Sequence, residues 1–102
     1  MLLKEFENWL LEFDTTKKGI HLSQSTAYKY SRAINTISNE MIENKIIDTN
    51  IINIIDWCEL EELIIKIKNS DIFISKNDRG NKMYSNALDY YLIFIKNKNI
   101  RH

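Results

Sequence analysis

The stretch from Asn77 to Lys96, NDRGNKMYSNALDYYLIFIK, decides the fold of this chain, because it carries the clearest helical periodicity in the sequence. Large side chains fall on one helical line at Tyr84, Leu88, Tyr91 and Ile95. Met83, Ala87, Leu92 and Phe94 widen that line to an apolar arc of roughly half the helix circumference. An arc this wide predicts a helix that other helices contact from several directions.

A tight turn is expected immediately before this helix, at Arg79-Gly80-Asn81. Glycine tolerates a positive φ without steric cost, and asparagine is the next most tolerant residue. The turn therefore separates the closing helix from whatever element precedes it.

Length and composition indicate a single domain over residues 1–102. The chain has 102 residues, 44% of them hydrophobic, which is enough for one core without disulfides or metal. Two glycines and no proline argue against a turn-rich β fold. We therefore expect an all-α protein, a compact bundle of four to five helices.

The remaining helices are located by periodicity and by capping residues. We expect helices over 2–13 and 23–44, a third over 56–68 that opens with an Asp56/Glu59 capping box, and a short fourth helix that follows Ser70 or Asp71 and ends by Asn77. Residues 15–22 are expected to form a loop, and residues 45–55 an irregular buried connection. The predicted core includes Trp9, Ile34, Ile37, Leu63, Tyr84, Leu88 and Tyr91.

Acids and bases are segregated along the chain, although there are 14 of each and the formal net charge is zero. The charged residues within 15–39 are all bases. Within 40–62 most charged residues are acids, and within 63–102 most are bases. A neutral domain with two basic segments can still present one basic face to a polyanion.

The outer face of the predicted 23–44 helix carries the most suggestive pattern for function. Tyr28, Arg32, Asn35 and Asn39 follow one another at steps of four, three and four, with Lys29 beside them. These side-chain types contact phosphates and base edges of nucleic acids. The alternative interpretation is an ordinary solvated helix surface.

Both basic segments together predict a nucleic-acid-binding face. Its expected members are Lys17, Lys18, Tyr28, Lys29, Arg32, Asn35, Asn39, Arg79, Asn81 and Lys82. The acidic outer face of the 56–68 helix, at Glu59 and Glu62, should lie away from it. That acidic face is the alternative surface for a protein partner.

The sequence does not predict an enzyme, because it shows no nucleophile or general base that would lie in a protected site. His21 falls in a predicted loop, His102 is the last residue, and the single cysteine, Cys58, lies among acids. No Cys/His spacing suits a metal, and no phosphate-binding motif is present, so neither a metal, a cofactor nor a small-molecule substrate is expected. The first residues do not form a signal peptide and no segment is long enough to span a membrane, which predicts a cytoplasmic protein.

Three segments carry a resemblance to known families: FENWL at 6–10, LSQSTAYKYSRAINTIS at 22–38 and RGNKMYSNALDYYLIFI at 79–95. The chain resembles the N-terminal helical domain of bacterial, modification-dependent restriction enzymes. It is also similar to the SAM-like core-binding domain of tyrosine recombinases. Both resemblances imply a helical module that contacts duplex DNA, and the resemblance to modification-dependent enzymes adds modified DNA as a candidate target. No effector domain follows in this sequence, so the catalytic roles of those families are not expected here.

Two functions remain open at this point. One is the DNA-binding part of a larger enzyme, either separated from it or free-standing. The other is a small phage-borne anti-defence protein that binds and inhibits a bacterial defence complex by protein contact. A further alternative is a module that assembles with itself through the 56–68 helix.

Overall fold

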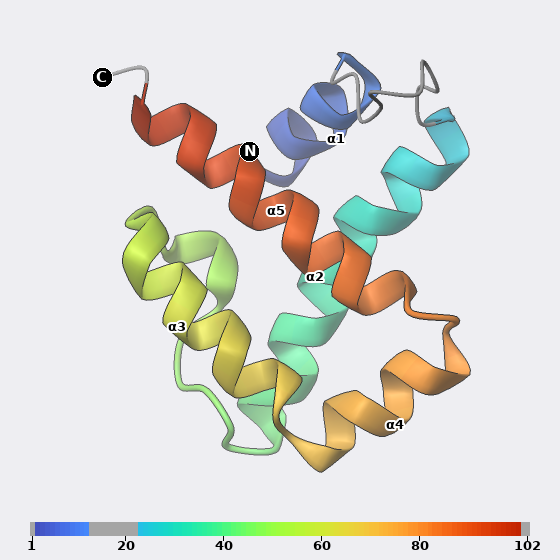
Figure 1. Cartoon of the computed structure of the whole chain (residues 1–102), viewed down its shortest axis with the longest axis vertical. Coiled ribbons are helices and arrows are strands. Elements are labelled where there is room, and N and C mark those ends of the chain that lie inside the picture. Colours follow the sequence, from blue (N-terminus) through green and yellow to red (C-terminus); the bar gives the residue numbers. More distant parts are fainter. Residues whose placement is uncertain (1, 13–22, 101–102) are drawn as a thin grey trace.

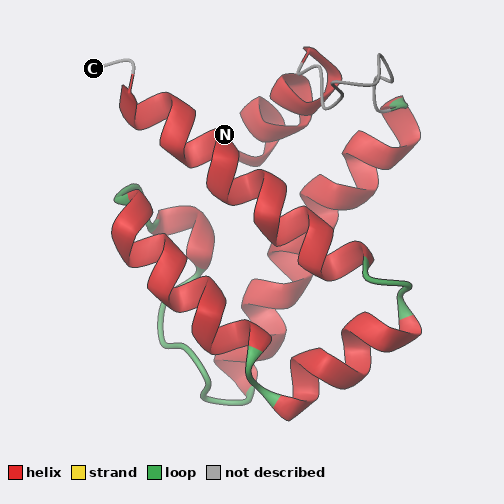
Figure 2. Cartoon of the chain, in the orientation of Figure 1, coloured by secondary structure: helices red, strands yellow, loops and turns green. Residues whose placement is uncertain are grey.

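The computed structural model describes residues 2–12 and 23–100, and within these ranges every regular element is helical (Figures 1 and 2). The elements in chain order are α1 (Leu2–Glu12), α2 (Gln24–Glu43), the 3₁₀ turn η1 (Ile51–Asn53), α3 (Trp57–Lys68), α4 (Asp71–Arg79) and α5 (Met83–Ile100). The prediction of an all-α bundle of four to five helices is confirmed. None of the described helices is both long enough and apolar enough to cross a bilayer.

Side-chain caps begin three of the helices where the sequence predicts them. The Ser23 hydroxyl accepts a 3.1 Å hydrogen bond from the Thr26 N–H at α2, and the Ser70 hydroxyl accepts one of 3.2 Å from the Phe73 N–H at α4. At α3 the Asp56 carboxylate accepts from the N–H of Cys58, at 3.1 Å, and not from that of Glu59 as a capping box requires. The cap is therefore present, but it satisfies a different one of the free N–H groups of the first turn.

α4 is longer than predicted, because it continues through Arg79 and does not end by Asn77. The N–H of Gly80 still donates to the Lys76 carbonyl at 3.0 Å, so the helical hydrogen-bond ladder closes one turn further along the chain. Asn77 consequently lies inside the helix, and its side chain is directed to the start of α5.

α5 is the central element of the bundle. It crosses α2 in Figure 1 and packs against α1, α2, α3 and α4. Leu88, Tyr91 and Ile95 are buried on its inner line, as are Ile34 and Ile37 on α2. Trp9, Leu63 and Tyr84 are only half-buried and pack on the edge of the core.

α1 packs against α5 through aromatic side chains. The Phe6 ring meets Tyr91 edge-on with centroids 5.1 Å apart, and it lies 5.4 Å from Phe94. The Tyr91 hydroxyl is buried with no hydrogen-bond partner among the described residues, and burial raises the pKa of this group.

The connection from α2 to α3 is irregular and largely apolar, as the paired isoleucines predict. Ile47, Ile51 and Ile54 are buried, and η1 interrupts the loop as one short turn. The buried Ser38 hydroxyl of α2 accepts a 3.4 Å hydrogen bond from the Ile51 N–H. This contact attaches the connection to α2.

Candidate nucleic-acid interface

The outer face of α2 is solvent-exposed over its whole length. Tyr28, Arg32, Asn35 and Asn39 all point outward because the buried stripe of Ala27, Ile34, Ile37 and Met41 occupies the opposite side of the helix. Arg32 donates a 3.0 Å hydrogen bond from Nη1 to the Tyr28 hydroxyl, and its guanidinium carbon lies 5.6 Å from the centre of that ring. The tyrosine therefore holds the guanidinium on the exposed face.

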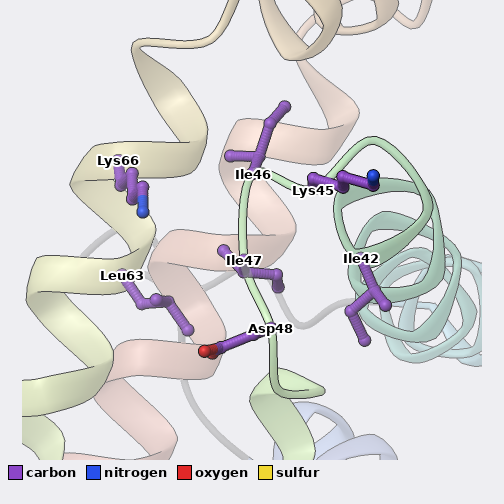
Figure 3. Close-up of a pocket in the computed structure, with 7 residues that line it drawn as sticks. All are labelled: Ile42, Lys45, Ile46, Ile47, Asp48, Leu63 and Lys66. Carbon is purple, nitrogen blue, oxygen red and sulfur yellow. The ribbon is translucent and has the colours of Figure 1, made fainter.

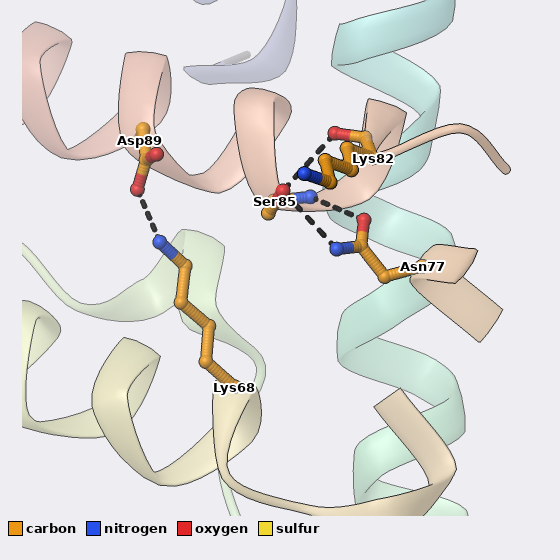
Figure 4. A network of polar contacts seen from close by, with 5 residues as sticks. All are labelled: Lys68, Asn77, Lys82, Ser85 and Asp89. Carbon is orange, nitrogen blue, oxygen red and sulfur yellow. Dashed lines mark hydrogen bonds and ion pairs between the residues drawn. The ribbon is translucent and has the colours of Figure 1, made fainter. Parts of the chain in front are cut away.

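The turn between α4 and α5 is held by a small polar network (Figure 4). Asn77 Oδ1 accepts a 3.0 Å hydrogen bond from the Ser85 N–H, and the Asn77 carbonyl accepts one of 2.9 Å from the Lys82 N–H. The Ser85 hydroxyl donates to the Lys82 carbonyl at 3.1 Å. These contacts fix the backbone of the turn, while the side chains of Arg79, Asn81 and Lys82 are exposed.

Gly80 does not have the role that the sequence predicts for it. Its φ is −96°, whereas the positive φ values of the turn belong to Asn81 at 54° and Lys82 at 66°. Glycine is required for space: a Cβ atom at this position would lie 2.8 Å from Cε2 of Tyr84. The close approach of the Tyr84 ring to the backbone is a tertiary contact that the local sequence pattern does not reveal.

α2 and the start of α5 enclose a shallow hollow of about 310 Å³, which we call the α2–α5 hollow. Its lining residues are Tyr28, Lys29, Arg32, Ala33, Thr36, Met83 and Tyr84. Lys82 immediately precedes Met83, so the hollow adjoins the α4–α5 turn. The structure thus brings the basic part of α2 next to the second predicted basic segment.

Ion pairing separates the basic residues into two groups. Lysines that pair with acids of another helix are Lys68 with Asp89, Lys76 with Glu40, Lys96 with Glu61 and Lys98 with Glu5. Within the described ranges, no ion pair involves Lys29, Arg32, Arg79 or Lys82. These four are all the basic members of the predicted face that the structure describes, and each lacks an acidic partner within the described ranges.

Two of the predicted basic residues, Lys17 and Lys18, lie outside the described residues. Asn35 lines a smaller hollow of about 200 Å³, the α1–α2 hollow, together with Leu3, Ser31, Arg32 and Thr36. Asn39 and Asn81 are exposed and line neither the α2–α5 hollow nor the α1–α2 hollow. Met83 and Tyr84 also line the α2–α5 hollow, which the sequence does not predict because their helical spacing assigns both to the core.

The acidic face of α3 lies apart from these residues. Glu59 and Glu62 are exposed, and neither lines the α2–α5 hollow. Figure 1 shows α3 and the α4–α5 turn at opposite sides of the bundle. The acids therefore do not neutralise the basic residues around the turn.

A third hollow, of about 400 Å³, lies between the end of α2 and α3 and is called the α2–α3 hollow (Figure 3). Ile42, Ile46, Ile47 and Leu63 supply apolar lining, and Lys45, Asp48 and Lys66 supply charge. In the part of the chain that the structure describes, no group of three or more His, Cys, Asp or Glu side chains is placed to hold a metal ion.

Comparison with protein families shows that residues 1–58 match the phage integrase SAM-like domain. The matched range includes α1, α2, η1 and the beginning of α3, and it covers more than half of the chain. Comparison with curated proteins and with solved structures gives no match. The resemblance to tyrosine recombinases is confirmed, whereas a relation to restriction enzymes stays a prediction. The chain belongs to the phage integrase SAM-like domain family, and this membership supports a DNA-binding helical module.

Proposed function

We propose that the chain binds duplex DNA without catalysing a reaction, with α2 supplying most contacts and the α4–α5 turn gripping the phosphate backbone. The observation that carries this proposal is the juxtaposition at the α2–α5 hollow. Lys29 and Arg32 line it, Lys82 adjoins it, and none of these three pairs with an acid among the described residues. Cations without an intramolecular partner are the ones available to replace counterions on DNA.

The contacts divide into two kinds. Lys29, Arg79 and Lys82 are assigned to phosphates, together with Lys17 and Lys18 from the segment before α2. Reading of bases is assigned to Arg32, Asn35 and Asn39, because arginine pairs with guanine and asparagine with adenine in the major groove. Only one of the Arg32 nitrogens is engaged with Tyr28, so the remaining donors are available to a base.

Fluorescence anisotropy with labelled duplexes at several salt concentrations tests the proposal. The three described cations assigned to phosphates predict a log-log salt slope of about −2.7, and the five with Lys17 and Lys18 predict about −4.5. Affinity is expected in the micromolar range or weaker. Absence of binding at low salt would contradict the proposal.

We further propose that the chain has a target-recognition or accessory role related to that of the N-terminal domains of restriction enzymes. Duplexes with and without modified cytosine, otherwise identical in sequence, test this part separately. Preferential binding of the modified duplex is expected if the role is modification-dependent. Equal affinity would retain DNA binding and remove this assignment.

A second candidate function is binding to a bacterial defence complex by protein contact. Its supporting observation is the α2–α3 hollow, whose apolar lining includes the exposed Ile42 and, between Lys45 and Lys66, Ile46 and Ile47 (Figure 3). An apolar lining with two cations, Lys45 and Lys66, and one acid, Asp48, fits a partly apolar protein segment that carries charges of both signs. Recovery of a defence complex by the wild-type chain, but not by Ile42→Asp, together with no DNA binding, would favour this function over the first.

A further inference from the structure

The α2–α5 hollow combines aromatic and apolar walls with a basic rim. The rings of Tyr28 and Tyr84 and the side chains of Ala33 and Met83 line it, while Lys29 and Arg32 bring positive charge. Its volume of about 310 Å³ is at the lower end of the range for small-ligand pockets. Neither the α1–α2 hollow nor the α2–α3 hollow has an aromatic lining residue.

Both aromatic rings are positioned by contacts within the protein. The Tyr28 ring is held by the Arg32 guanidinium through the cation–π contact and the hydrogen bond to its hydroxyl. The Tyr84 ring has Lys76 Nζ 4.9 Å from its centre, and that nitrogen is in turn 3.0 Å from a Glu40 carboxylate oxygen. Gly80 lets the edge of the Tyr84 ring approach the backbone. Rings that are already positioned lose little freedom when a flat group stacks on them.

We infer that the α2–α5 hollow receives one unpaired base of the bound DNA. Nucleic-acid bases stack on aromatic side chains, and extruded bases are held between aromatic and apolar groups. Lys29 is then placed to contact a phosphate next to that base, while Arg32 lies beside the base itself. This inference rests on the proposed DNA binding and adds to it a preference for a base that is not paired.

Three labelled duplexes distinguish this inference from simple duplex binding. One is fully paired, one carries a single unpaired adenosine as a bulge, and one carries the same bulge as an abasic sugar-phosphate. The adenosine bulge is expected to bind about fivefold tighter or more than the other two, because stacking on an aromatic side chain contributes at least that much. The abasic duplex controls for the extra flexibility of a bulge.

Thr36→Phe tests the location, because exposed Thr36 lines the hollow and a phenyl ring there would fill it without changing charge. The variant is expected to lose the preference for the adenosine bulge, so that it binds all three duplexes with equal affinity. Ser75→Phe, at an exposed α4 position that lines none of the three hollows, should keep the preference for the adenosine bulge. Unchanged melting temperatures of both variants establish that they fold.

Other results would overturn the inference. Equal affinity for the adenosine and abasic bulges, with paired-duplex binding intact, refutes the base pocket and leaves the proposed function standing. A bulge preference that survives Thr36→Phe refutes the location. Absence of binding to all three duplexes at low salt refutes the base pocket and the proposed function together.

Discussion

Tyr84 packs so closely over Gly80 that a Cβ atom on the glycine would lie 2.8 Å from Cε2 of the ring and 3.1 Å from Cδ2. The contact joins the end of α4 to the first turn of α5 and fixes the direction of the chain between them. It also places the Tyr84 ring in the wall of the α2–α5 hollow.

Gly80→Ala is expected to destabilise the fold by about 1–3 kcal/mol, the usual range for overpacking. The backbone is not the cause, because a φ of −96° is accessible to alanine. In a Tyr84→Ala background the same substitution should be neutral, or stabilising by up to about 1 kcal/mol through the unfolded chain. Urea denaturation of the four variants of this double-mutant cycle measures the coupling. An equal cost of Gly80→Ala in both backgrounds would show that the steric contact is not responsible.

Leu88→Ala should cost about 2–5 kcal/mol, because Leu88 is fully buried on the inner side of α5. Ile93→Ala is the matched control on the same helix, where the side chain is 39% exposed, and its cost should be much smaller. Chemical denaturation measures both. Similar losses at the two positions would contradict the central place of α5 in the core.

Lys29→Ala and Lys82→Ala should each weaken binding to every duplex alike and reduce the magnitude of the salt slope by about one. Lys96→Ala is the control, because Lys96 is engaged with Glu61 at 3.8 Å and lies over the Trp57 ring. Its slope should equal that of the wild type. Anisotropy titrations over a range of salt concentrations give all four slopes, and a change in slope at Lys96 alone would place the binding surface elsewhere.

Asn35→Ala should relax sequence preference and leave the salt slope unchanged, because an amide reads bases and carries no charge. The measured quantity is the ratio of affinities for a selected and a scrambled duplex. Asn53→Ala, at an exposed position of η1, is expected to leave that ratio as it is. If the ratio falls equally in both variants, Asn35 does not contact bases.

Tyr91→Phe should stabilise the protein at neutral pH by about 1 kcal/mol, because it removes a buried hydroxyl that has no partner among the described residues. Burial raises the pKa of Tyr91 above its ordinary value of 10.0. The folded state therefore favours the neutral phenol. Protonation of Tyr91 makes its full contribution to the free energy of unfolding below pH 10, and that contribution declines as the pH rises above 10. Between pH 8 and 11, the wild type should lose more stability than Tyr91→Phe in parallel urea titrations. Parallel pH profiles would show that Tyr91 does not titrate differently on folding.

Local sequence rules determined the helices of this protein. Periodicity located α2 and α5, and Ser23, Asp56 and Ser70 marked three helix starts, because capping and side-chain periodicity act over three or four residues. The same rules gave the exposed stripe of Tyr28, Arg32, Asn35 and Asn39, since a helix fixes which residues share a face. They failed at the end of α4, where the N–H of Gly80 donates to the carbonyls of Lys76 and Asn77 and the helix extends past Asn77.

Only the tertiary structure decided which basic residues lack acidic partners and which segments meet. Lys76 and Lys82 look alike in the sequence, yet Lys76 pairs with Glu40 on another helix while Lys82 extends from an exposed turn. The α2–α5 hollow exists because α5 crosses α2 at a place that no local pattern specifies. Ion pairs and hollows depend on contacts between residues far apart in the chain, and those contacts are set by how the helices pack together.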